Sequence, residues 1–361
     1  MQTGQNYRPR CREVGIAIGA DAVGPNNAIT DVAGVRVGHV TLVQGEGPLR
    51  IGAGPVRTGV TAILPPGDDW WERPVEAGQF TFNGSGTTAG LSCIDEYHRI
   101  ETPICLTNTL SVGSAYEGIV RYMVDEVFRR RGEVPWFNPV VGETSDAFLN
   151  DIGGLHVRPA HAYEAIEKAR GGPVPEGSVG GGTGMSTLGW KGGIGTSSRT
   201  LRLGRDDLTI GVLVQSNFGG RLTIGGIDMA ALERPQDEQR YGGSIMIVVA
   251  TDAPLDGHQL ERLGRRATFG LARAGSSGGH GSGDYAIAFS TTWRRPDEKK
   301  TARQALAIKP GRLDRLFQAS ADATEEAILN ALFRATTVVG RDGNTREALP
   351  LDPVLARIRT A

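Results

Sequence analysis

The chain has 361 residues, with 39 Lys and Arg against 40 Asp and Glu, so its formal net charge is −1. This length exceeds that of a minimal binding module and allows a substantial core. Balanced charge gives no overall field that would attract nucleic acid or an anionic membrane, so we expect neither as a partner.

The three cysteines, Cys11, Cys93 and Cys105, are widely spaced and form no CxxC pair. The spacing indicates neither a disulfide framework nor a zinc site, and buried, reduced thiols are expected. The polar N-terminus lacks the apolar core of a signal peptide, and no later window approaches the ~18 apolar residues of a membrane span. We therefore expect a cytoplasmic protein.

The first half of the chain alternates predicted strands and helices. Punctuation by Gly and Pro predicts short strands over 29–42 and 59–67. A glycine loop that leads into a helix is predicted over 83–100, followed by a strand over 102–110. Apolar residues at helical spacing, with arginines in the last turn, predict a helix over 113–131.

The middle of the chain is harder to interpret. Residues 160–200 are rich in glycine and are expected to be mostly loop. A strong strand is predicted over 208–219, with 220–229 as its hairpin partner and Gly-Gly in or near the turn. The charged segment 231–240 is expected to be an exposed loop before a buried strand over 245–250.

The last third again alternates helix and strand. Leu260, Leu263, Ala267 and Leu271 fall on one face of a predicted helix over 256–275. A strand is predicted over 284–292, and a helix with acidic residues in its first turn over 320–338. No repeat of 20–50 residues and no tandem domain boundary is evident.

Several short motifs match chemical signatures, but such matches are frequent in a chain this rich in glycine. Residues 84–89 fit the dinucleotide fingerprint G-x-G-x-x-A before a helix, but residues 281–286 fit it equally well and run into a strand. Residues 275–279 fit the hydrolase elbow G-x-S-x-G, which needs strand, turn and helix in that order, whereas here a helix precedes. His280 lies near Ser282 and could act as a base, although an isolated histidine in a glycine loop is more often a bystander.

The six histidines show no metal-ligand spacing, so no metal is indicated, and no cofactor is expected.

The stretch Gly242-Gly243-Ser244 places a flexible joint and a hydroxyl directly before the buried strand. One interpretation is a serine that merely begins a strand. The other is that the Ser244 hydroxyl attacks the carbonyl of Gly243, so that the chain cuts itself and Ser244 becomes a new N-terminus. Such an attack needs a strained backbone, and Gly-Gly adopts conformations that other residues cannot. The released amine would have a pKa of about 7.7–8.0 and could activate its own hydroxyl.

Longer blocks give a more specific signal, because eight of them occur in a fixed order between about residues 25 and 340. They resemble the L-aminopeptidase/D-esterase/amidase and β-peptidyl aminopeptidase family of self-processing N-terminal-serine hydrolases. The blocks are ITDVAGVRVGH, GVTAILP, PICLTNTLSVG, VVGETSDAFLNDI, VQSNFG, GGSIMIVVATDAPL, HQLERLGRRATFGLARAGS and GSGD.

The resemblance implies the fold and the maturation. It implies one peptidase domain over 1–361, an α/β (α+β) fold with a four-layer α/β/β/α sandwich like that of N-terminal-nucleophile hydrolases. It also implies a cut between Gly243 and Ser244 into an α chain of 1–243 and a β chain of 244–361. The two chains would stay together, and a homo-oligomer, a tetramer of such processed pairs, is implied as well.

The resemblance also implies roles for particular residues. Ser244 would be the nucleophile and Asn217 the oxyanion donor, a contribution worth about 3–4 kcal/mol per donor. Ser282 and Asp284 would support proton transfer, because a serine can both donate and accept and a carboxylate favours a nearby ammonium. Glu143 would bind the substrate ammonium through a charge-assisted hydrogen bond. Each residue also has an ordinary structural interpretation, such as a strand-end cap, a turn residue or a surface charge.

One position departs from the family pattern. Some members carry a tyrosine two residues after the acidic residue, and this chain has Ser145. A changed pocket wall alters substrate preference, since small pocket changes are worth only about 1–3 kcal/mol each. The chemistry is therefore expected to be conserved, while preference among α-peptides, β-peptides and D-amino-acid amides stays open.

We therefore predict a self-processing serine aminopeptidase or amidase that acts on small peptides or amino-acid amides. Two rivals stay open at this point: a nucleotide-dependent enzyme that uses Gly84 to Ala89, and a non-catalytic binding protein of the same fold.

Overall fold

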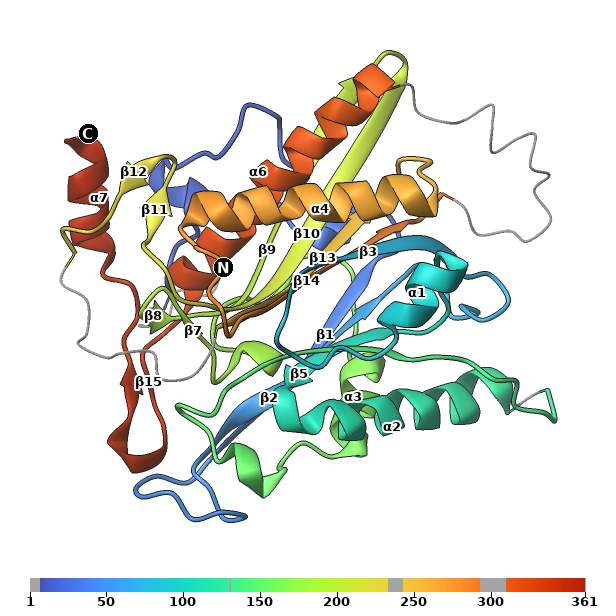
Figure 1. The fold of residues 1–361 in the computed structure, drawn as a ribbon, viewed down its shortest axis with the longest axis horizontal. Coiled ribbons are helices and arrows are strands. Elements are labelled where there is room, and N and C mark those ends of the chain that lie inside the picture. The colour runs from blue at the N-terminus through green and yellow to red at the C-terminus, as the bar shows by residue number, and fades with distance from the viewer. Residues whose placement is uncertain (1–6, 130, 233–242, 293–309, 361) are drawn as a thin grey trace.

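The computed structural model describes residues 7–129, 131–232, 243–292 and 310–360. These residues form four layers, in which two sheets lie face to face and helices cover both outer faces (Figure 1). Helices α4 (Gly257–Ala274) and α6 (Pro310–Arg334) cover one sheet, and α2 (Val112–Tyr122) and α3 (Pro159–Glu167) cover the other. This is the α/β/β/α sandwich that the sequence resemblance implied, so that prediction is confirmed.

The larger sheet has six strands among the described residues, and it combines segments that are far apart in the chain. In spatial order they are β4 (Arg99–Ile100), β3 (Val75–Gly84), β14 (Gly283–Ser290), β13 (Ser244–Thr251), β10 (Asp206–Asn217) and β9 (Gly193–Leu203). β13 pairs with β10 antiparallel and with β14 parallel. The strand that begins at Ser244 is therefore central and has partners on both sides.

The second described sheet has four strands: β1 (Arg36–Gln44), β2 (Val56–Leu64), β5 (Ile104–Asn108) and β6 (Val140–Thr144). β5 and β6 are parallel, so their carboxyl ends meet at one edge. Outside the two sheets lie helices α1 (Leu91–Tyr97) and α7 (Leu351–Arg359) and three short hairpins. These hairpins are β7–β8 (Ser186–Thr187, Trp190–Lys191), β11–β12 (Thr223–Ile224, Ile227–Asp228) and β15–β16 (Val338–Val339, Thr345–Arg346).

Apolar side chains alternate along β13 between two cores, because successive strand residues point to opposite faces. Ile245, Ile247 and Val249 pack on the helix side, whereas Met246 and Val248 pack between the sheets. Ser244 has the same parity as Met246, so its side chain belongs to the face between the sheets. A third core lies between the four-stranded sheet and its helices.

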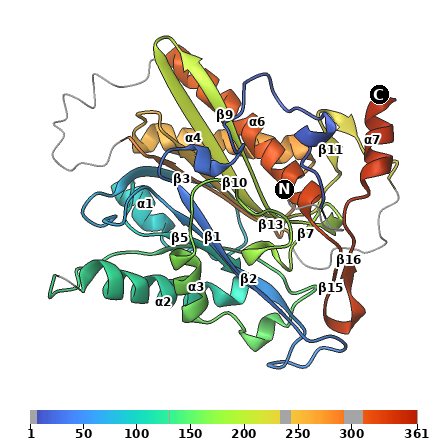
Figure 2. The same ribbon diagram turned by 180° about the vertical axis from the view of Figure 1, so that it is seen from behind.

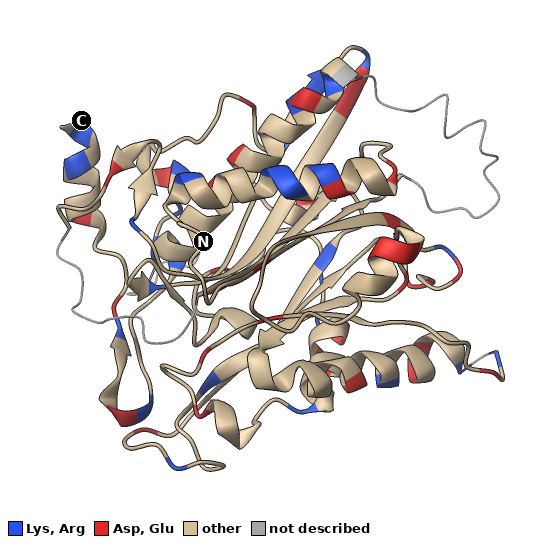
Figure 3. Ribbon diagram, in the orientation of Figure 1, with Lys and Arg blue, Asp and Glu red and all other residues tan. Residues whose placement is uncertain are grey.

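The N-terminal segment lies against α6, as Figure 2 shows from behind. Arg8 donates to the carbonyl of Phe333, and Arg12 pairs with Glu326 at 2.8 Å. Glu326 also pairs with the fully buried Arg199 of β9 at 2.8 Å. In Figure 3 the charged residues gather on the outer faces of helices and on loops, while the strands of both sheets are largely uncharged.

Most predicted elements occur in the structure, with two corrections in the middle of the chain. The partner of 208–219 is not 220–229, because that segment folds on itself as β11–β12 around a Gly225-Gly226 turn with positive φ at both glycines. The region 160–200, expected to be mostly loop, holds regular structure that was not predicted: α3 runs to Glu167, β9 begins at Gly193, and the β7–β8 hairpin lies between them. Residues 233–240 of the predicted exposed loop lie outside the described residues.

The last long helix begins ten residues earlier than predicted, at Pro310 rather than near Ser320. The acidic residues that the sequence placed in the first turn are therefore in the middle of the helix. Asp322, Glu325 and Glu326 are buried there and lie close to arginines. No described helix is long and apolar enough to cross a bilayer.

Of the three cysteines, Cys11 and Cys105 are buried and Cys93 is partly exposed, and all three are free thiols.

Candidate active site

Three neighbouring strands of the six-stranded sheet bring the predicted catalytic residues together at one end. Asn217 is the last residue of β10 and lies opposite Ser244, the first residue of β13. On the other side, Ser244 pairs with Gly283, the first residue of β14. Residues 217, 244 and 283 are distant in sequence, and strand pairing alone aligns them.

The Ser244 hydroxyl is close to the bond that it is predicted to cut. Its Oγ donates to the carbonyl oxygen of Gly243 at 2.7 Å. A C=O bond is only about 1.23 Å long, so the carbonyl carbon is within reach of the same oxygen. The backbone N–H of Gly283 donates to the Gly243 carbonyl at 3.1 Å and to Ser244 Oγ at 3.3 Å. An N–H in this position can stabilise negative charge that develops on the carbonyl oxygen.

Gly243 departs from one expectation, because its φ is not in the left-handed region. The residue is glycine because of space: a Cβ at this position would lie 2.9 Å from Phe218 Cα and 3.1 Å from Gly219 N. The close approach of two backbones, rather than a left-handed backbone, therefore explains the glycine before the serine. Gly242 lies outside the described residues.

The side-chain amide of Asn217 is held in one orientation. Its Oδ1 accepts from the backbone N–H of Ser186 at 2.8 Å, and its Nδ2 donates to the carbonyl of Ser145 at 2.9 Å. An amide nitrogen carries two N–H groups, and the second has no acceptor among the described residues. Asn217 therefore has a spare donor beside Ser244.

Ser282 and Asp284 form a hydrogen-bonded pair. Ser282 Oγ donates to Asp284 Oδ1 at 2.6 Å, and Asn83 Nδ2 donates to the other carboxylate oxygen at 3.0 Å. Burial raises the pKa of Asp284, and the hydrogen bonds from Ser282 and Asn83 lower it in part. A buried carboxyl with a raised pKa next to a hydroxyl is suited to proton transfer.

Glu143 is the next-to-last residue of β6, in the second sheet, and is 2% exposed. The hydroxyl of Thr109 and the backbone N–H of Thr87, at 2.8 Å, donate to its two carboxylate oxygens. Burial raises the pKa of Glu143, and the two hydrogen bonds lower it in part. Among the described residues no cation pairs with this carboxylate, so it can form an ion pair with a cationic group of a ligand.

The loop after β3 connects Glu143 with the nucleophile. A Cβ on Gly86 would lie 2.7 Å from Glu143 Oε1 and 3.5 Å from Gly283 Cα. Gly283 in turn contacts Ser244 Oγ, so the predicted ammonium site and the nucleophile belong to one site. The Thr87 N–H that a nucleotide phosphate would need is already bonded to a carboxylate, which argues against the dinucleotide alternative.

A pocket of about 290 Å³ opens next to this centre. Its lining includes Gly243, Phe218 and Ser282, together with the exposed His280. Ser244 is therefore neither isolated in apolar packing nor without a neighbouring cleft. In the part of the chain that the structure describes, the His280 ring makes no hydrogen bond, which fits the interpretation as a bystander.

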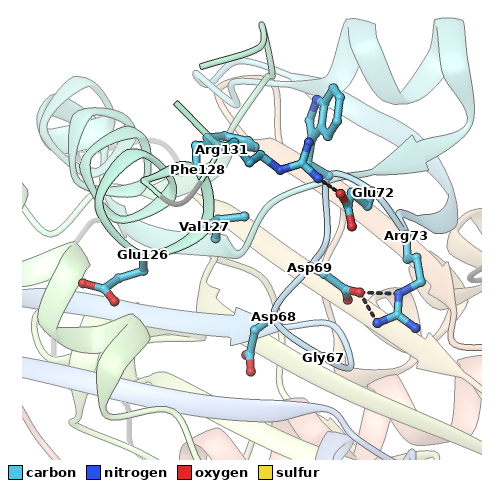
Figure 4. Close-up of a pocket in the computed structure, with 10 residues that line it drawn as sticks. Gly67, Asp68, Asp69, Glu72, Arg73, Glu126, Val127, Phe128 and Arg131 are labelled. Atoms are coloured by element: carbon cyan, nitrogen blue, oxygen red, sulfur yellow. Dashed lines mark hydrogen bonds and ion pairs between the residues drawn. The ribbon is translucent and has the colours of Figure 1, made fainter. Parts of the chain in front are cut away.

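A larger pocket, of about 500 Å³, lies elsewhere, between the loop after β2 and the π-helical turn Met123–Phe128 (Figure 4). Two ion pairs lie within its lining, Asp69 with Arg73 and Glu72 with Arg131. None of the predicted site residues lines it, so its size does not make it the active site.

Sequence reasoning missed several groups of the site. The Gly283 N–H is a backbone donor, and residue types carry no signal for it. Thr109 lies near the end of the predicted strand 102–110, and Asn83 and Thr87 lie in the predicted glycine loop that begins at residue 83; those positions were their only available signal. Ser145, the residue that stands where some family members have a tyrosine, is half-buried. Its backbone carbonyl, not its side chain, accepts the hydrogen bond from Asn217.

Comparisons with known proteins agree with this site. The family described as peptidase family S58 matches residues 27–346. The beta-peptidyl aminopeptidase BapA of Sphingosinicella microcystinivorans is 43% identical over 363 residues, which cover 95% of this chain and 90% of that protein.

Two solved structures are similar over 98% of this chain and 99% of their own, each with a TM-score of 0.88. The L-aminopeptidase D-Ala-esterase/amidase of Ochrobactrum anthropi is 40% identical and is described as a prototype for the serine aminopeptidases with a variant of the Ntn hydrolase fold. The PH0078 protein of Pyrococcus horikoshii OT3 is 45% identical.

Proposed function

The chain belongs to peptidase family S58, and on this basis we propose that it is a self-processing serine aminopeptidase that uses Ser244 for both maturation and turnover. It is a hydrolase of the aminopeptidase type, like its curated relatives. The observation that carries the proposal is the contact of 2.7 Å between Ser244 Oγ and the carbonyl oxygen of Gly243.

Maturation begins when Ser244 Oγ attacks the carbonyl carbon of Gly243. The hydroxyl proton passes through Ser282 and Asp284 to the departing Ser244 nitrogen, and the oxyanion is stabilised by Gly283 N–H and the spare donor of Asn217. The resulting ester between Gly243 and Ser244 is opened by water. The products are a carboxylate on Gly243 and a free α-amine on Ser244.

The two chains, 1–243 and 244–361, would remain associated after the cut. This expectation is supported by the sheet order, because β13 and β14 of the second fragment lie between β3 and β10 of the first. Separating them would break the pairing on both sides of this two-strand insert.

In turnover the free α-amine of Ser244 accepts the proton of its own hydroxyl, and Oγ attacks the acyl carbon of the substrate. The amine leaving group takes the proton, and water then hydrolyses the acyl-enzyme. Glu143 binds the substrate ammonium, which restricts the enzyme to substrates with a free N-terminus. Ser145, whose carbonyl accepts from Asn217, is proposed to influence which substrates fit.

The substrate is proposed to be a small peptide or an amino-acid amide or ester. The curated relatives are named for β-peptides and a solved relative for L-amino acids and D-Ala esters and amides. A panel of α-aminoacyl, β-aminoacyl and D-aminoacyl p-nitroanilides would rank these classes.

We also propose a homo-oligomer of processed pairs, as the resemblance implies. Large apolar side chains at the surface, including Ile51, Trp136 and Phe269, are available for such contacts. Light scattering after gel filtration would give the mass. The cytoplasmic location expected from the sequence stays a prediction.

Ser244→Ala tests the central proposal. Intact mass measurement should find two fragments that meet at 243/244 in the wild type and one full-length chain in the variant. Ser276→Ala is a matched control, because that serine also lines the pocket but is not proposed to react. A wild type that stays in one piece after long incubation, or a cleaved Ser244→Ala, would refute the proposal.

A further inference from the structure

One peptide unit joins Tyr285 to Glu143. The carbonyl of Gly86 accepts from Tyr285 Oη at 2.9 Å, and the N–H of Thr87, on the other side of the same unit, donates to Glu143 Oε1 at 2.8 Å. A peptide unit is planar and rigid, so fixing its carbonyl also fixes the direction of its N–H. A hydrogen bond to the carbonyl also polarises the unit and strengthens the N–H as a donor.

The two ends of this link are buried while the loop between them is exposed. Tyr285 is 6% and Glu143 2% exposed, whereas Gly86 and Thr87 are exposed to solvent. Nearby, the loop is otherwise attached by Ser85 N–H to the carbonyl of Ser282 at 3.2 Å. Without the tyrosine hydroxyl, the peptide unit 86–87 would be held only by the carboxylate that it is meant to orient.

The tyrosine and the glutamate also interact electrostatically. Burial raises the pKa of Tyr285, and the negative charge of Glu143 raises it further. Thr109 and Thr87 face Glu143 from the two neighbouring loops and Tyr285 faces it from β14. Among the described residues, no cation pairs with the carboxylate. The ionised form of Glu143 therefore depends on a few donors, one of which is oriented by Tyr285.

The geometry points to Tyr285 as a positioning residue that holds Glu143 ready for the substrate ammonium through the peptide unit 86–87. This inference rests on the proposed function, because it assigns a support to the ammonium site of that function. Gly86 has no room for a side chain, since its Cβ would lie 2.7 Å from Glu143 Oε1 and 3.3 Å from Tyr285 Cε2. A methyl group there would therefore press on the Glu143 carboxylate and on the Tyr285 ring.

Tyr285→Phe removes the hydroxyl and keeps the ring. We expect normal self-processing, an unchanged kcat, and a KM about tenfold higher for aminoacyl p-nitroanilides, as for the loss of one hydrogen bond next to a charge. The acidic limb of kcat/KM should move to higher pH, because a weaker Thr87 donor raises the pKa of Glu143. p-Nitrophenyl propionate, which has no amine, should be hydrolysed at the wild-type rate.

Tyr163→Phe is the matched control, because Tyr163 of α3 also donates its hydroxyl to a glutamate, Glu126 of the turn Met123–Phe128, at 2.8 Å. This variant should leave KM unchanged. The inference would be overturned if Tyr285→Phe left the KM for amine substrates unchanged. It would also be overturned if the variant raised the KM for the propionate ester as much as the KM for amine substrates. If Tyr285→Phe does not fold, Gly86→Ala carries the test, and it should raise KM for amine substrates alone.

A double-mutant cycle separates this inference from the proposed function. In a Glu143→Gln background, Tyr285→Phe should have no further effect on KM. If Glu143→Gln raises KM and Tyr285→Phe does not, only the role of Tyr285 is refuted. No effect of Glu143→Gln on KM would refute the ammonium site and with it this inference, while self-processing at Ser244 would still stand or fall separately.

Discussion

Asn217 and Ser244 lie directly opposite each other at the ends of two neighbouring antiparallel strands, and the amide of Asn217 is held by Ser186 and Ser145. The strand pairing places the amide beside the hydroxyl, and Ser186 and the loop residue Ser145 fix its orientation. Four predictions follow from this arrangement and from the groups around it.

The first prediction concerns Asn217. Asn217→Ala removes a proposed oxyanion donor, so self-processing and kcat should each fall about 10²–10³-fold, while KM changes little. Fragment formation over time and p-nitroanilide kinetics measure the two effects. Asn344→Ala is the control, because Asn344 Nδ2 also donates to a backbone carbonyl, that of Phe148, at 2.8 Å. Near-normal rates in Asn217→Ala would remove this residue from the mechanism.

The second prediction concerns the Ser282–Asp284 pair. Ser282→Ala and Asp284→Asn should each slow self-processing about 10²-fold or more, the usual contribution of a general acid–base group. Because the hydroxyl donates to the carboxylate at 2.6 Å, the double variant should be little slower than the worse single variant. Additive losses would mean that the two side chains act separately.

The third prediction is a pH profile for Glu143. Burial raises its pKa, and only the ionised form attracts an ammonium, so kcat/KM for amine substrates should fall with decreasing pH, starting above the usual glutamate range. p-Nitrophenyl propionate should lack this limb but keep the limb due to the Ser244 amine, at about 7.7–8.0. Glu143→Gln should make the two profiles alike. Identical wild-type profiles for both substrates would contradict the assignment.

The fourth prediction concerns stability and Asp146, which follows Ser145. Its Oδ1 accepts from Asn150 at 3.0 Å, and burial raises its pKa to about 7, although hydrogen bonds from Thr58, Asn150 and Asn108 lower it in part. The protonated form is the one that the fold favours. The contribution of this group to stability is therefore full below its unfolded pKa near 3.8 and is lost as the pH rises to about 7.

Asp146→Asn should remove that dependence. Between pH 4 and pH 8, the free energy of unfolding of the chain that carries Asp146 should fall by about 4 kcal/mol relative to that of Asp146→Asn. Denaturant titrations are best made in the unprocessed Ser244→Ala chain, where unfolding involves a single polypeptide. Asp314→Asn, at an exposed position of α6, serves as the control for an Asp→Asn change away from this buried site. A difference between the wild type and Asp146→Asn that does not change with pH would show that the carboxyl is not buried in its neutral form.

Much of the fold could be predicted because apolar runs and helical spacing mark β10, β13, β14 and α4. β9 was missed because its sequence, GIGTSSRTLRL, is poor in apolar residues. The structure explains why: a Cβ on Gly195 would lie 1.9 Å from the carbonyl of Ala327, so α6 packs directly on the backbone of that strand. Small residues in a buried strand cannot be told from a loop by composition.

The candidate site was predictable only in part for a related reason. Ser244, Asn217, Ser282, Asp284 and Glu143 were proposed because several blocks together resembled a family, and the structure places them near one another. The role of the Gly283 N–H and the link from Tyr285 through Gly86 depend on backbone groups, which any residue supplies. Those groups could be found only from coordinates.

If the chain is cut as proposed, the insertion of β13 and β14 between β3 and β10 has a consequence for how the processed enzyme refolds. While the chain is continuous, closing that sheet is an intramolecular event. Once it is cut, the same closure requires two separate polypeptides to meet, so recovery from heat or denaturant would depend on protein concentration and would be slow in dilute solution. Assembly would thus be efficient only before self-cleavage, while both segments still belong to one polypeptide.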